Sequence, residues 1–171
     1  MENDVHSDIL KDFIKDKKRI LITTHLNPDA DGIGSELALA AFLQQQNIDT
    51  VLLNSDPLPA FFTFLDQEQK IEQFQPERDT ERIHSCDGII IVDVSDKNRL
   101  GDIADAIPDT MPLAVIDHHI VTEKHHEHMI IDGSASSTGE LLYDLFNQFD
   151  VQWTREIIDA LYACILTDTG S

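Results

Sequence analysis

The chain has 171 residues, 42% of them hydrophobic, which is enough to bury the core of about one domain. It carries 32 acidic and 12 basic residues, a formal net charge of −20. That balance excludes a surface that coats nucleic acid through counterion release, so any polyanionic ligand must be held locally. The acidic excess is typical of a solvated surface, with part of it concentrated in a metal site.

The cysteines and the N-terminus indicate a soluble, cytoplasmic protein. Cys86 and Cys164 are too few and too far apart for a disulfide framework, so we expect reduced thiols. Residues 1–4 lack the basic region of a signal peptide. No apolar run reaches the roughly 18 residues that a membrane span needs, so we expect no membrane partner.

The first half of the chain alternates between predicted helices and strands. Residues 4–18 repeat apolar side chains at helical spacing, and residues 19–24 predict a short strand. Strong helix formers at 35–43 precede a second strand at 50–53, which completes a strand–helix–strand unit. The segment 56–82 has no readable pattern.

The second half predicts a sheet that is covered on both faces. Residues 88–93 and 113–117 form continuous apolar runs, the pattern of strands buried on both sides. Helices are expected at about 138–149 and 155–166. We therefore predict the α/β class, with a mostly parallel central sheet and helices on both of its faces.

Three residues of metal-ligand type share one position relative to the predicted strands. His25, Asp93 and Asp117 each stand where an apolar strand reaches its carboxyl end. Ligands bind at that edge in open α/β sheets, and solvated acids have no reason to choose it. Oxygen and imidazole donors together suit a pair of divalent cations, for which the natural substrate is a phosphate ester or anhydride.

Asp29 and Asp31 add two carboxylates to the same edge. One residue separates them, so in an extended loop both point to one side, roughly 6 to 7 Å apart, and each can serve a different metal. Gly32 and Gly34 allow a sharp turn, and a helix that starts near Ser35 would aim its N–H groups at phosphate oxygens held there. Taken alone, the stretch also fits a turn with an Asp cap for the next helix.

Four motifs carry a resemblance to a known family. In order, they are His25-x-x-Pro28-Asp29-x-Asp31, Val92-Asp93, Asp117-His118-His119 and Thr167-Asp168-Thr169-Gly170. They resemble the motifs of the DHH phosphoesterase superfamily, and the resemblance covers the chain from about residue 18 to its end. The segments 27–29, 93–101 and 135–140 are similar to the oligoribonuclease and phosphoadenosine-phosphate phosphatase group rather than to inorganic pyrophosphatases.

The resemblance implies two divalent metal ions and a division of ligands between them. The first ion would be bound by His25 and Asp29, the second by Asp31, His118 and Asp168, with Asp93 as the bridge. Water or hydroxide between the ions would attack phosphorus in line, so no side-chain nucleophile is required. Mn²⁺ follows from the resemblance, whereas the ligand types also admit Fe²⁺, Co²⁺ or Zn²⁺.

The expected catalytic set consists of Asp93, Asp117, His118 and His119. Asp117 is expected to accept a hydrogen bond from an imidazole and fix its tautomer rather than bind metal. His119 would face the substrate and donate to a phosphate oxygen or to the leaving group. Arg99 and Lys97 are the basic residues near Asp93 in sequence; Arg99 either contacts a phosphate or belongs to the solvated surface.

Other polar residues have plainer interpretations. The run Ser136, Ser137 and Thr138, with Glu140, predicts the N-cap region of the next helix; contact with a phosphate or with a metal ligand is the alternative. We expect a surface loop for His125, His126 and His128. His6 and His84 are expected on an exposed helix face and in a loop, and neither is assigned a role.

The resemblance implies an enzyme that releases mononucleotides from very short RNA and removes the 3′ phosphate of adenosine 3′,5′-bisphosphate. The same site could instead act on cyclic dinucleotides, polyphosphate, pyrophosphate or single-stranded DNA. A non-catalytic nucleotide-binding module is the third hypothesis, although a complete ligand set argues against it. Superfamily members continue into a smaller DHH-associated domain with a basic substrate-binding surface, so residues 1–171 are expected to be the catalytic half of a longer protein. A homodimer stays open.

Overall fold

The computed structural model describes residues 2–120 and 126–170. Its strands are β1 (Arg19–Thr23), β2 (Asp49–Asn54), β3 (Ile71–Gln73), β4 (Gly88–Val92), β5 (Leu113–Asp117) and β6 (His128–Ile131). Its α-helices are α1 (Glu2–Ile14), α2 (Ala30–Gln45), α3 (Pro76–His84), α4 (Ile103–Ala106), α5 (Thr138–Phe146) and α6 (Arg155–Asp168). Two 3₁₀ turns, η1 (Ala60–Phe62) and η2 (Lys97–Leu100), lie in the connections.

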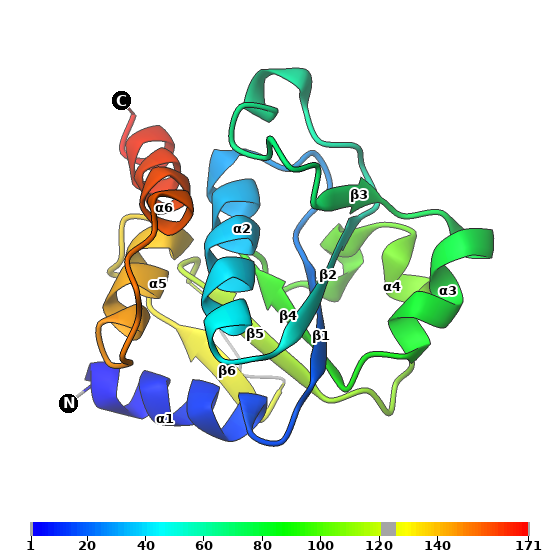
Figure 1. Ribbon diagram of the computed structural model, residues 1–171, viewed down its shortest axis with the longest axis horizontal. Helices are drawn as coiled ribbons and strands as arrows, with labels where there is room; N and C mark the ends of the chain where they lie inside the picture. The colour runs from blue at the N-terminus through cyan, green and yellow to red at the C-terminus, as the bar shows by residue number, and fades with distance from the viewer. Residues whose placement is uncertain (1, 121–125, 171) are drawn as a thin grey trace.

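The strands form one sheet in the order β3-β2-β1-β4-β5-β6, and every pairing is parallel (Figure 1). The chain runs outward from β1 to β3, returns to place β4 beside β1, and then runs outward the other way to β6. The order therefore reverses between β1 and β4. Connections that leave these two strands diverge at their carboxyl ends and open a crevice there, the usual ligand position in such sheets.

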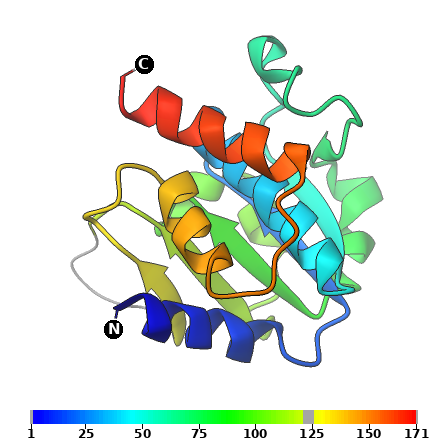
Figure 2. The same cartoon turned by 60° about the vertical axis from the view of Figure 1, so that its left-hand side comes forward.

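Helices cover both faces of the sheet, which confirms the predicted fold class. On one face, Ile20 and Ile22 of β1 pack in a core with residues of α1, α2, α5 and α6. On the other, Leu21 packs with residues of α3 and α4. Successive residues of a strand point to opposite faces, so both faces must be apolar, as the continuous runs predicted. Figure 2 shows the first of these layers in front of the sheet, with α6 lying along α2 and α5.

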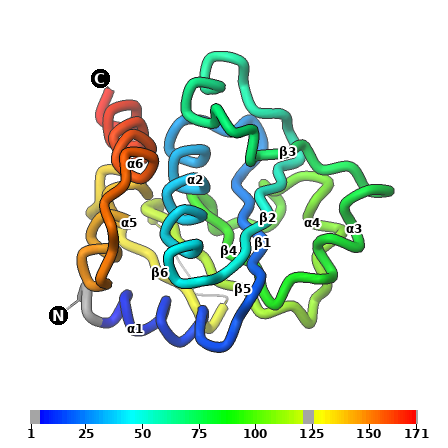
Figure 3. The backbone as a smooth tube through the Cα atoms, viewed as in Figure 1, coloured from blue at the N-terminus to red at the C-terminus, as the bar shows by residue number. Residues whose placement is uncertain are grey.

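The segment 56–82, which had no readable pattern, contains η1, β3 and α3. β3 is a three-residue edge strand in which Ile71 is the buried residue, too short for an alternation to be seen. α3 buries Ile83 and Asp79, and apart from Pro76 its remaining residues are polar or charged, so it shows no apolar periodicity. In Figure 3 the part of this segment between β2 and β3 forms a long loop beyond the carboxyl end of β2.

The helices of the described ranges are short. The longest, α2, has 16 residues. Among residues 2–120 and 126–170, no helix combines the length and the apolar character that crossing a lipid bilayer requires.

Candidate metal centre at the carboxyl edge of the sheet

His25 follows β1 and is buried in the crevice beside β4. Its Nε2 lies 3.3 Å from Oδ2 of Asp93 and 3.8 Å from Oδ2 of Asp29. Its Nδ1 lies 2.8 Å from the carbonyl oxygen of Leu26, to which an Nδ1–H donates, so Nε2 is left facing the two carboxylates. Hydrogen bonding to Asp29 and Asp93 outweighs burial and raises the pKa of His25 to about 10.

Asp29 and Asp31 lie at the start of α2 and not in an extended loop, so that prediction was wrong. Asp29 is the N-cap residue, and its Oδ1 accepts hydrogen bonds from the N–H groups of Asp31 and Gly32 at 3.0 and 3.1 Å. The helix therefore begins at Ala30 rather than near Ser35. The cap uses one oxygen of Asp29, and the other, Oδ2, is the oxygen near His25.

A second group of candidate ligands consists of Asp31 of α2, His118 directly after β5, and Asp168 of α6. Nε2 of His118 lies 3.7 Å from Oδ2 of Asp31 and 3.4 Å from Oδ2 of Asp168. Asp31 is fully buried, whereas the side chain of Asp168 is 25% exposed. Nε2 of His118 is a buried nitrogen without a hydrogen-bond partner among the described residues. Buried polar atoms rarely stay unpaired, so a cation is the simplest partner for this nitrogen.

Asp93 stands between the two groups. Its Oδ2 lies 3.3 Å from Nε2 of His25, and its Oδ1 lies 3.8 Å from Nε2 of His118. Its backbone, directly after β4, has a φ of 60°. The left-handed conformation costs a non-glycine residue about 1 kcal/mol or more, although Asp and Asn tolerate it best, and such strain is found at functional sites. The carboxylate thus presents one oxygen to each group.

The site brings several buried carboxylates close together, which favours the binding of cations. Burial and the neighbouring charge of Asp93 raise the pKa of Asp31 to about 8, and burial with the charges of Asp29 and Asp93 raises that of Asp168. Carboxylates buried at such close range repel one another unless cations neutralise them. Among the described residues, three triads have donor atoms within 4.8 Å of one another. Two of them, His25 with Asp29 and Asp93, and Asp31 with His118 and Asp168, together contain the six ligands that the resemblance implies; the third is Asp93 with His118 and His119. Their oxygen and imidazole donors fit two divalent cations.

Asp117, at the end of β5, is tied to His119 rather than to the candidate ligands. Its Oδ1 accepts hydrogen bonds from the backbone N–H of His119 at 3.0 Å and from Nδ1 of its ring at 2.7 Å. Its Oδ2 accepts the hydroxyl of Ser95 at 2.5 Å. Because Nδ1 of His119 is engaged, Nε2 is the nitrogen left to act, on a side chain that is 53% exposed. Sequence reasoning missed Ser95, whose one signal is its place two residues after Asp93.

The Ser/Thr run before α5 both caps the helix and contacts candidate metal ligands. Ser137 is the N-cap residue, and its hydroxyl oxygen accepts the N–H of Glu140 at 3.0 Å, as predicted. Thr138 also contacts candidate metal ligands: its hydroxyl donates to Oδ1 of Asp93 at 3.0 Å, and its N–H donates to Oδ2 of Asp31 at 2.7 Å. The alternative weighed from the sequence is therefore present in the structure beside the cap.

A network of buried polar side chains joins the ends of β1 and β2 to α2. Sequence reasoning missed this network. Asn54, at the end of β2, accepts the hydroxyl of Thr23 at 3.1 Å and the N–H of Thr24 at 3.0 Å. Its amide donates to Oε2 of Glu36 at 2.7 Å. The other oxygen of Glu36 has no hydrogen-bond partner among the described residues, and burial raises the pKa of its carboxyl to about 8. The network fixes the backbone immediately before His25.

The basic residues after Asp93 differ in their surroundings. The backbone carbonyl of Arg99 accepts the N–H of Leu26 at 2.7 Å, which places η2 against the loop that carries His25. The Arg99 side chain is exposed. Lys97 lies 3.8 Å from Asp109 in an ion pair. Of the two, Arg99 is the residue whose backbone contacts the loop that carries His25.

Three predictions for the other histidines were wrong. His84, expected in a loop, is the last residue of α3. His128 lies in β6, with Nε2 3.3 Å from Oδ2 of Asp12, rather than in a surface loop. His6 is buried rather than on an exposed helix face. His126 lies in a bend just before β6, whereas His125 lies outside the described residues. Both cysteines are buried and unpaired, as predicted.

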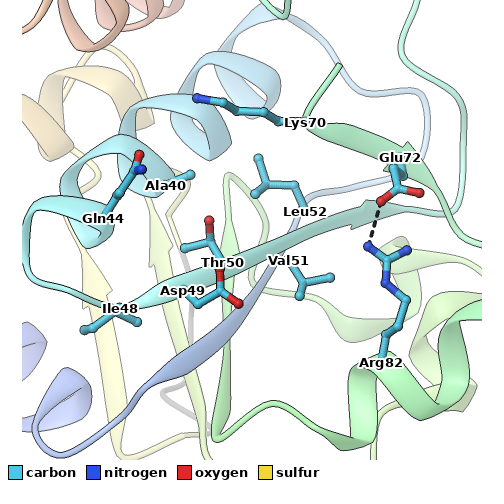
Figure 4. A pocket seen from close by; sticks show the side chains of 10 residues that line it. All are labelled: Ala40, Gln44, Ile48, Asp49, Thr50, Val51, Leu52, Lys70, Glu72 and Arg82. Carbon is cyan, nitrogen blue, oxygen red and sulfur yellow. Dashed lines mark hydrogen bonds and ion pairs between the residues drawn. The ribbon is translucent and has the colours of Figure 1, made fainter. Parts of the chain in front are cut away.

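A cavity of about 280 Å³ lies elsewhere, between the first residues of β2, the end of α2 and the edge strand β3 (Figure 4). None of its lining residues belongs to the two ligand triads of the candidate centre. Its basic groups are already paired, Arg82 with Glu72 and Lys70 with an acid of α6. We assign it no ligand.

Comparison with known proteins agrees with the geometry. The model of the DHH family, N-terminal domain, matches residues 19–165. The bifunctional oligoribonuclease and PAP phosphatase NrnA of Thermus thermophilus is 30% identical over 152 residues, which cover 89% of this chain and 44% of the relative. The protein of the same name in Bacillus subtilis is 27% identical over 158 residues, covering 88% and 46%. The chain thus spans about half the length of these curated relatives.

Solved structures share the fold. An exopolyphosphatase-related protein of Bacteroides fragilis superposes with a TM-score of 0.89 at 26% identity, over 98% of this chain and 51% of that one. RecJ of Thermus thermophilus, in complex with Mn²⁺, gives a TM-score of 0.53 at 16% identity, over 94% and 23%, a likeness of fold alone. With a family model that spans most of its length, the chain belongs to the DHH family.

Proposed function

We propose that this protein is a two-metal phosphoesterase that releases mononucleotides from short oligoribonucleotides and removes the 3′ phosphate of adenosine 3′,5′-bisphosphate. The observation that carries the proposal is the placement of Asp93, whose Oδ2 faces His25 at 3.3 Å and whose Oδ1 faces His118 at 3.8 Å. A carboxylate with one oxygen toward each of two ligand groups is the bridge that a pair of cations requires.

The proposed division of ligands follows the two triads. His25 and Asp29 hold the first ion, and Asp31, His118 and Asp168 the second, with Asp93 shared. When bound, the ions, which we take to be Mn²⁺, supply a water of lowered pKa and charge stabilisation at the phosphoryl oxygens. The hydrogen bond from Nδ1 of His25 to the carbonyl of Leu26 orients the ring so that Nε2 faces the site.

His119 is the proposed proton donor. The carboxylate of Asp117 accepts the Nδ1 proton at 2.7 Å, which leaves Nε2 as the ring nitrogen that can carry a proton to the substrate. Donation from Nε2 to a phosphate oxygen, or to the leaving oxygen as the ester bond breaks, assists departure of the alcohol. Arg99, exposed on the neighbouring η2, is the proposed contact for a substrate phosphate.

The distribution of charge bears on how a substrate is held. A net charge of −20 repels an oligonucleotide except near the cations and the few basic groups. We propose that residues 1–171 are the catalytic domain and that a second domain, in the half of the relatives that this chain does not span, supplies basic substrate-binding groups.

Polyphosphate is the second candidate substrate, because the structure with a TM-score of 0.89 is that of an exopolyphosphatase-related protein. The same triads would serve it, since an anhydride and an ester present similar phosphoryl oxygens to the cations. The competing proposals therefore differ in substrate and not in the site.

The test offers the protein with Mn²⁺ a mixture of a diribonucleotide, adenosine 3′,5′-bisphosphate, a cyclic dinucleotide and polyphosphate, with products identified by mass. Consumption of the first two supports the proposal, and selective consumption of another substrate replaces the assignment while keeping the site. Asp93→Asn, which keeps a residue that tolerates a positive φ, is expected to abolish turnover. Asp150→Asn, a change at an exposed acid, is the matched control. Unchanged turnover in Asp93→Asn would refute the two-metal mechanism.

A further inference from the structure

The first turn of α5 contacts two of the proposed ligand carboxylates at once. The N–H of Thr138 donates to Oδ2 of Asp31 at 2.7 Å, and the N–H of Gly139 donates to Oδ1 of the same carboxylate at 3.0 Å. The hydroxyl of Thr138 donates to Oδ1 of Asp93 at 3.0 Å. Thr138 and Asp31 are fully buried, and Asp93 is 2% exposed. Hydrogen bonds in such an environment hold their partners firmly.

The N–H groups of this turn are divided between the cap and the site. Ser137 accepts the N–H of Glu140 at 3.0 Å, and the Glu140 carboxylate in return accepts the N–H of Ser136 at 2.6 Å. The two remaining N–H groups, those of Thr138 and Gly139, are the ones that reach Asp31. The helix dipole favours a carboxylate there. The cap thus fixes the turn and leaves both donors for the ligand.

The hydroxyl contact determines how Asp93 presents its oxygens. Oδ1 has two lone pairs, one of which accepts the Thr138 proton, so one remains on the side of His118. Oδ2 stays directed at His25. Without the hydroxyl, Oδ1 loses its hydrogen bond, and the contact between Oδ2 and His25 is left to resist rotation of the carboxylate about the Cβ–Cγ bond.

We propose that Thr138 is a positioning residue: its N–H holds Asp31, its hydroxyl holds Asp93, and together they fix the spacing between the two ion positions. The inference rests on the proposed function, because it takes Asp31 and Asp93 as ligands. β-Branching restricts χ1 of threonine, which keeps the hydroxyl on the side of Asp93. In this proposal Thr138 acts through the carboxylates of Asp31 and Asp93, the two groups that it contacts.

The test compares Mn²⁺ binding by the parent protein, Thr138→Val and Thr138→Ser, using titration calorimetry for affinity and electron paramagnetic resonance for coupling between two ions. Valine keeps the shape and the N–H but lacks the hydroxyl. We expect Thr138→Val to weaken Mn²⁺ binding by about 10- to 100-fold and to diminish the coupled-pair signal. Thr138→Ser should restore both. Thr80→Val, which removes a hydroxyl that donates to a carbonyl of α3, is the matched control and should bind as the parent does.

The outcomes separate this inference from the proposed function. Equal Mn²⁺ binding and equal coupling in the parent and Thr138→Val would overturn the inference alone. A loss in Thr138→Ser as large as that in Thr138→Val would also overturn it, because the hydroxyl would then be irrelevant. If the parent binds no pair of Mn²⁺ ions, the proposed function fails first. Should Thr138→Val not fold, Thr138→Ala removes the same hydroxyl, and the same loss is expected.

Discussion

Nδ1 of His119 donates a 2.7 Å hydrogen bond to Oδ1 of Asp117, a residue that is 1% exposed. This contact fixes which nitrogen of the ring faces outward. In Asp117→Asn the amide can present N–H to Nδ1, which favours the other tautomer of the ring. We expect turnover to fall by about 10- to 100-fold while Mn²⁺ affinity is nearly retained. Steady-state kinetics and Mn²⁺ titration on the same samples check this.

Ser95→Ala is the matched control for that variant. It removes a hydrogen bond to Oδ2 of Asp117 but leaves the charge and the contact with His119. A smaller loss of turnover is expected. If Ser95→Ala and Asp117→Asn lose the same activity, the orientation of Asp117 matters more than the tautomer of His119.

Cation binding should stabilise the folded protein. Asp168→Asn should separate the effect of Mn²⁺ binding on stability from the effect of repulsion among the carboxylates. Asp168 is a carboxylate whose pKa is raised by burial and by the charges of Asp29 and Asp93. In chelator, the variant relieves this repulsion, so its unfolding temperature should equal or exceed that of the parent. In Mn²⁺ at about 100 times the dissociation constant, the parent should gain about 2.7 kcal/mol, and the variant clearly less. Thermal unfolding with and without Mn²⁺ measures both; an equal gain in the two proteins would remove Asp168 from the ligand set.

The raised pKa of Glu36 should make the free energy of unfolding fall as the pH rises. Burial, helped by the charge of Asp66 and opposed by Asn54 and His25, raises the pKa of its carboxyl from 4.5 to about 8. Between these values the folded protein holds a proton that the unfolded chain has released, so this contribution is complete below pH 4.5 and lost as the pH passes 8. Glu36→Gln, which stays neutral, should lack it. Urea unfolding of both proteins from pH 5 to 9 should show a stability difference that grows toward pH 8 and then levels off; a constant difference would contradict the raised pKa.

The sequence allowed the edge of the site to be predicted because apolar runs define where strands end. His25, Asp93 and Asp117 follow from those ends, and a parallel sheet brings the ends together whatever the intervening segments do. Asp168 could be found only through its motif, since nothing in the pattern of α6 shows that its last turn reaches His118.

The remaining contacts could not be predicted because they join residues far apart in sequence. The N–H of Thr138 reaches Asp31 across 107 residues and its hydroxyl reaches Asp93 across 45, and no local periodicity encodes either contact. The start of α2 was misplaced for another reason: Gly32 and Gly34 suggested a turn, yet the Asp29 cap begins the helix before them.

Gly139 provides a packing test of the same region. A Cβ added there would lie 2.3 Å from Cβ and 2.9 Å from Sγ of Cys164, where α5 meets α6. Alanine is the better helix former by about 1 kcal/mol, so a loss of stability in Gly139→Ala must come from crowding. We expect a net loss of about 1–3 kcal/mol, with weaker Mn²⁺ binding because the Gly139 N–H holds Asp31.

Gly133→Ala is the control for that change. Its added Cβ would meet Cγ1 of Ile120 at 2.8 Å, but Ile120 is 86% exposed and free to move aside, so the change should stay within about 0.5 kcal/mol. Chemical unfolding and Mn²⁺ titration of both variants provide the measurements. If Gly139→Ala matches Gly133→Ala in both, α5 and α6 can separate without disturbing Asp31, and the close approach of the two helices is not what holds that ligand in place.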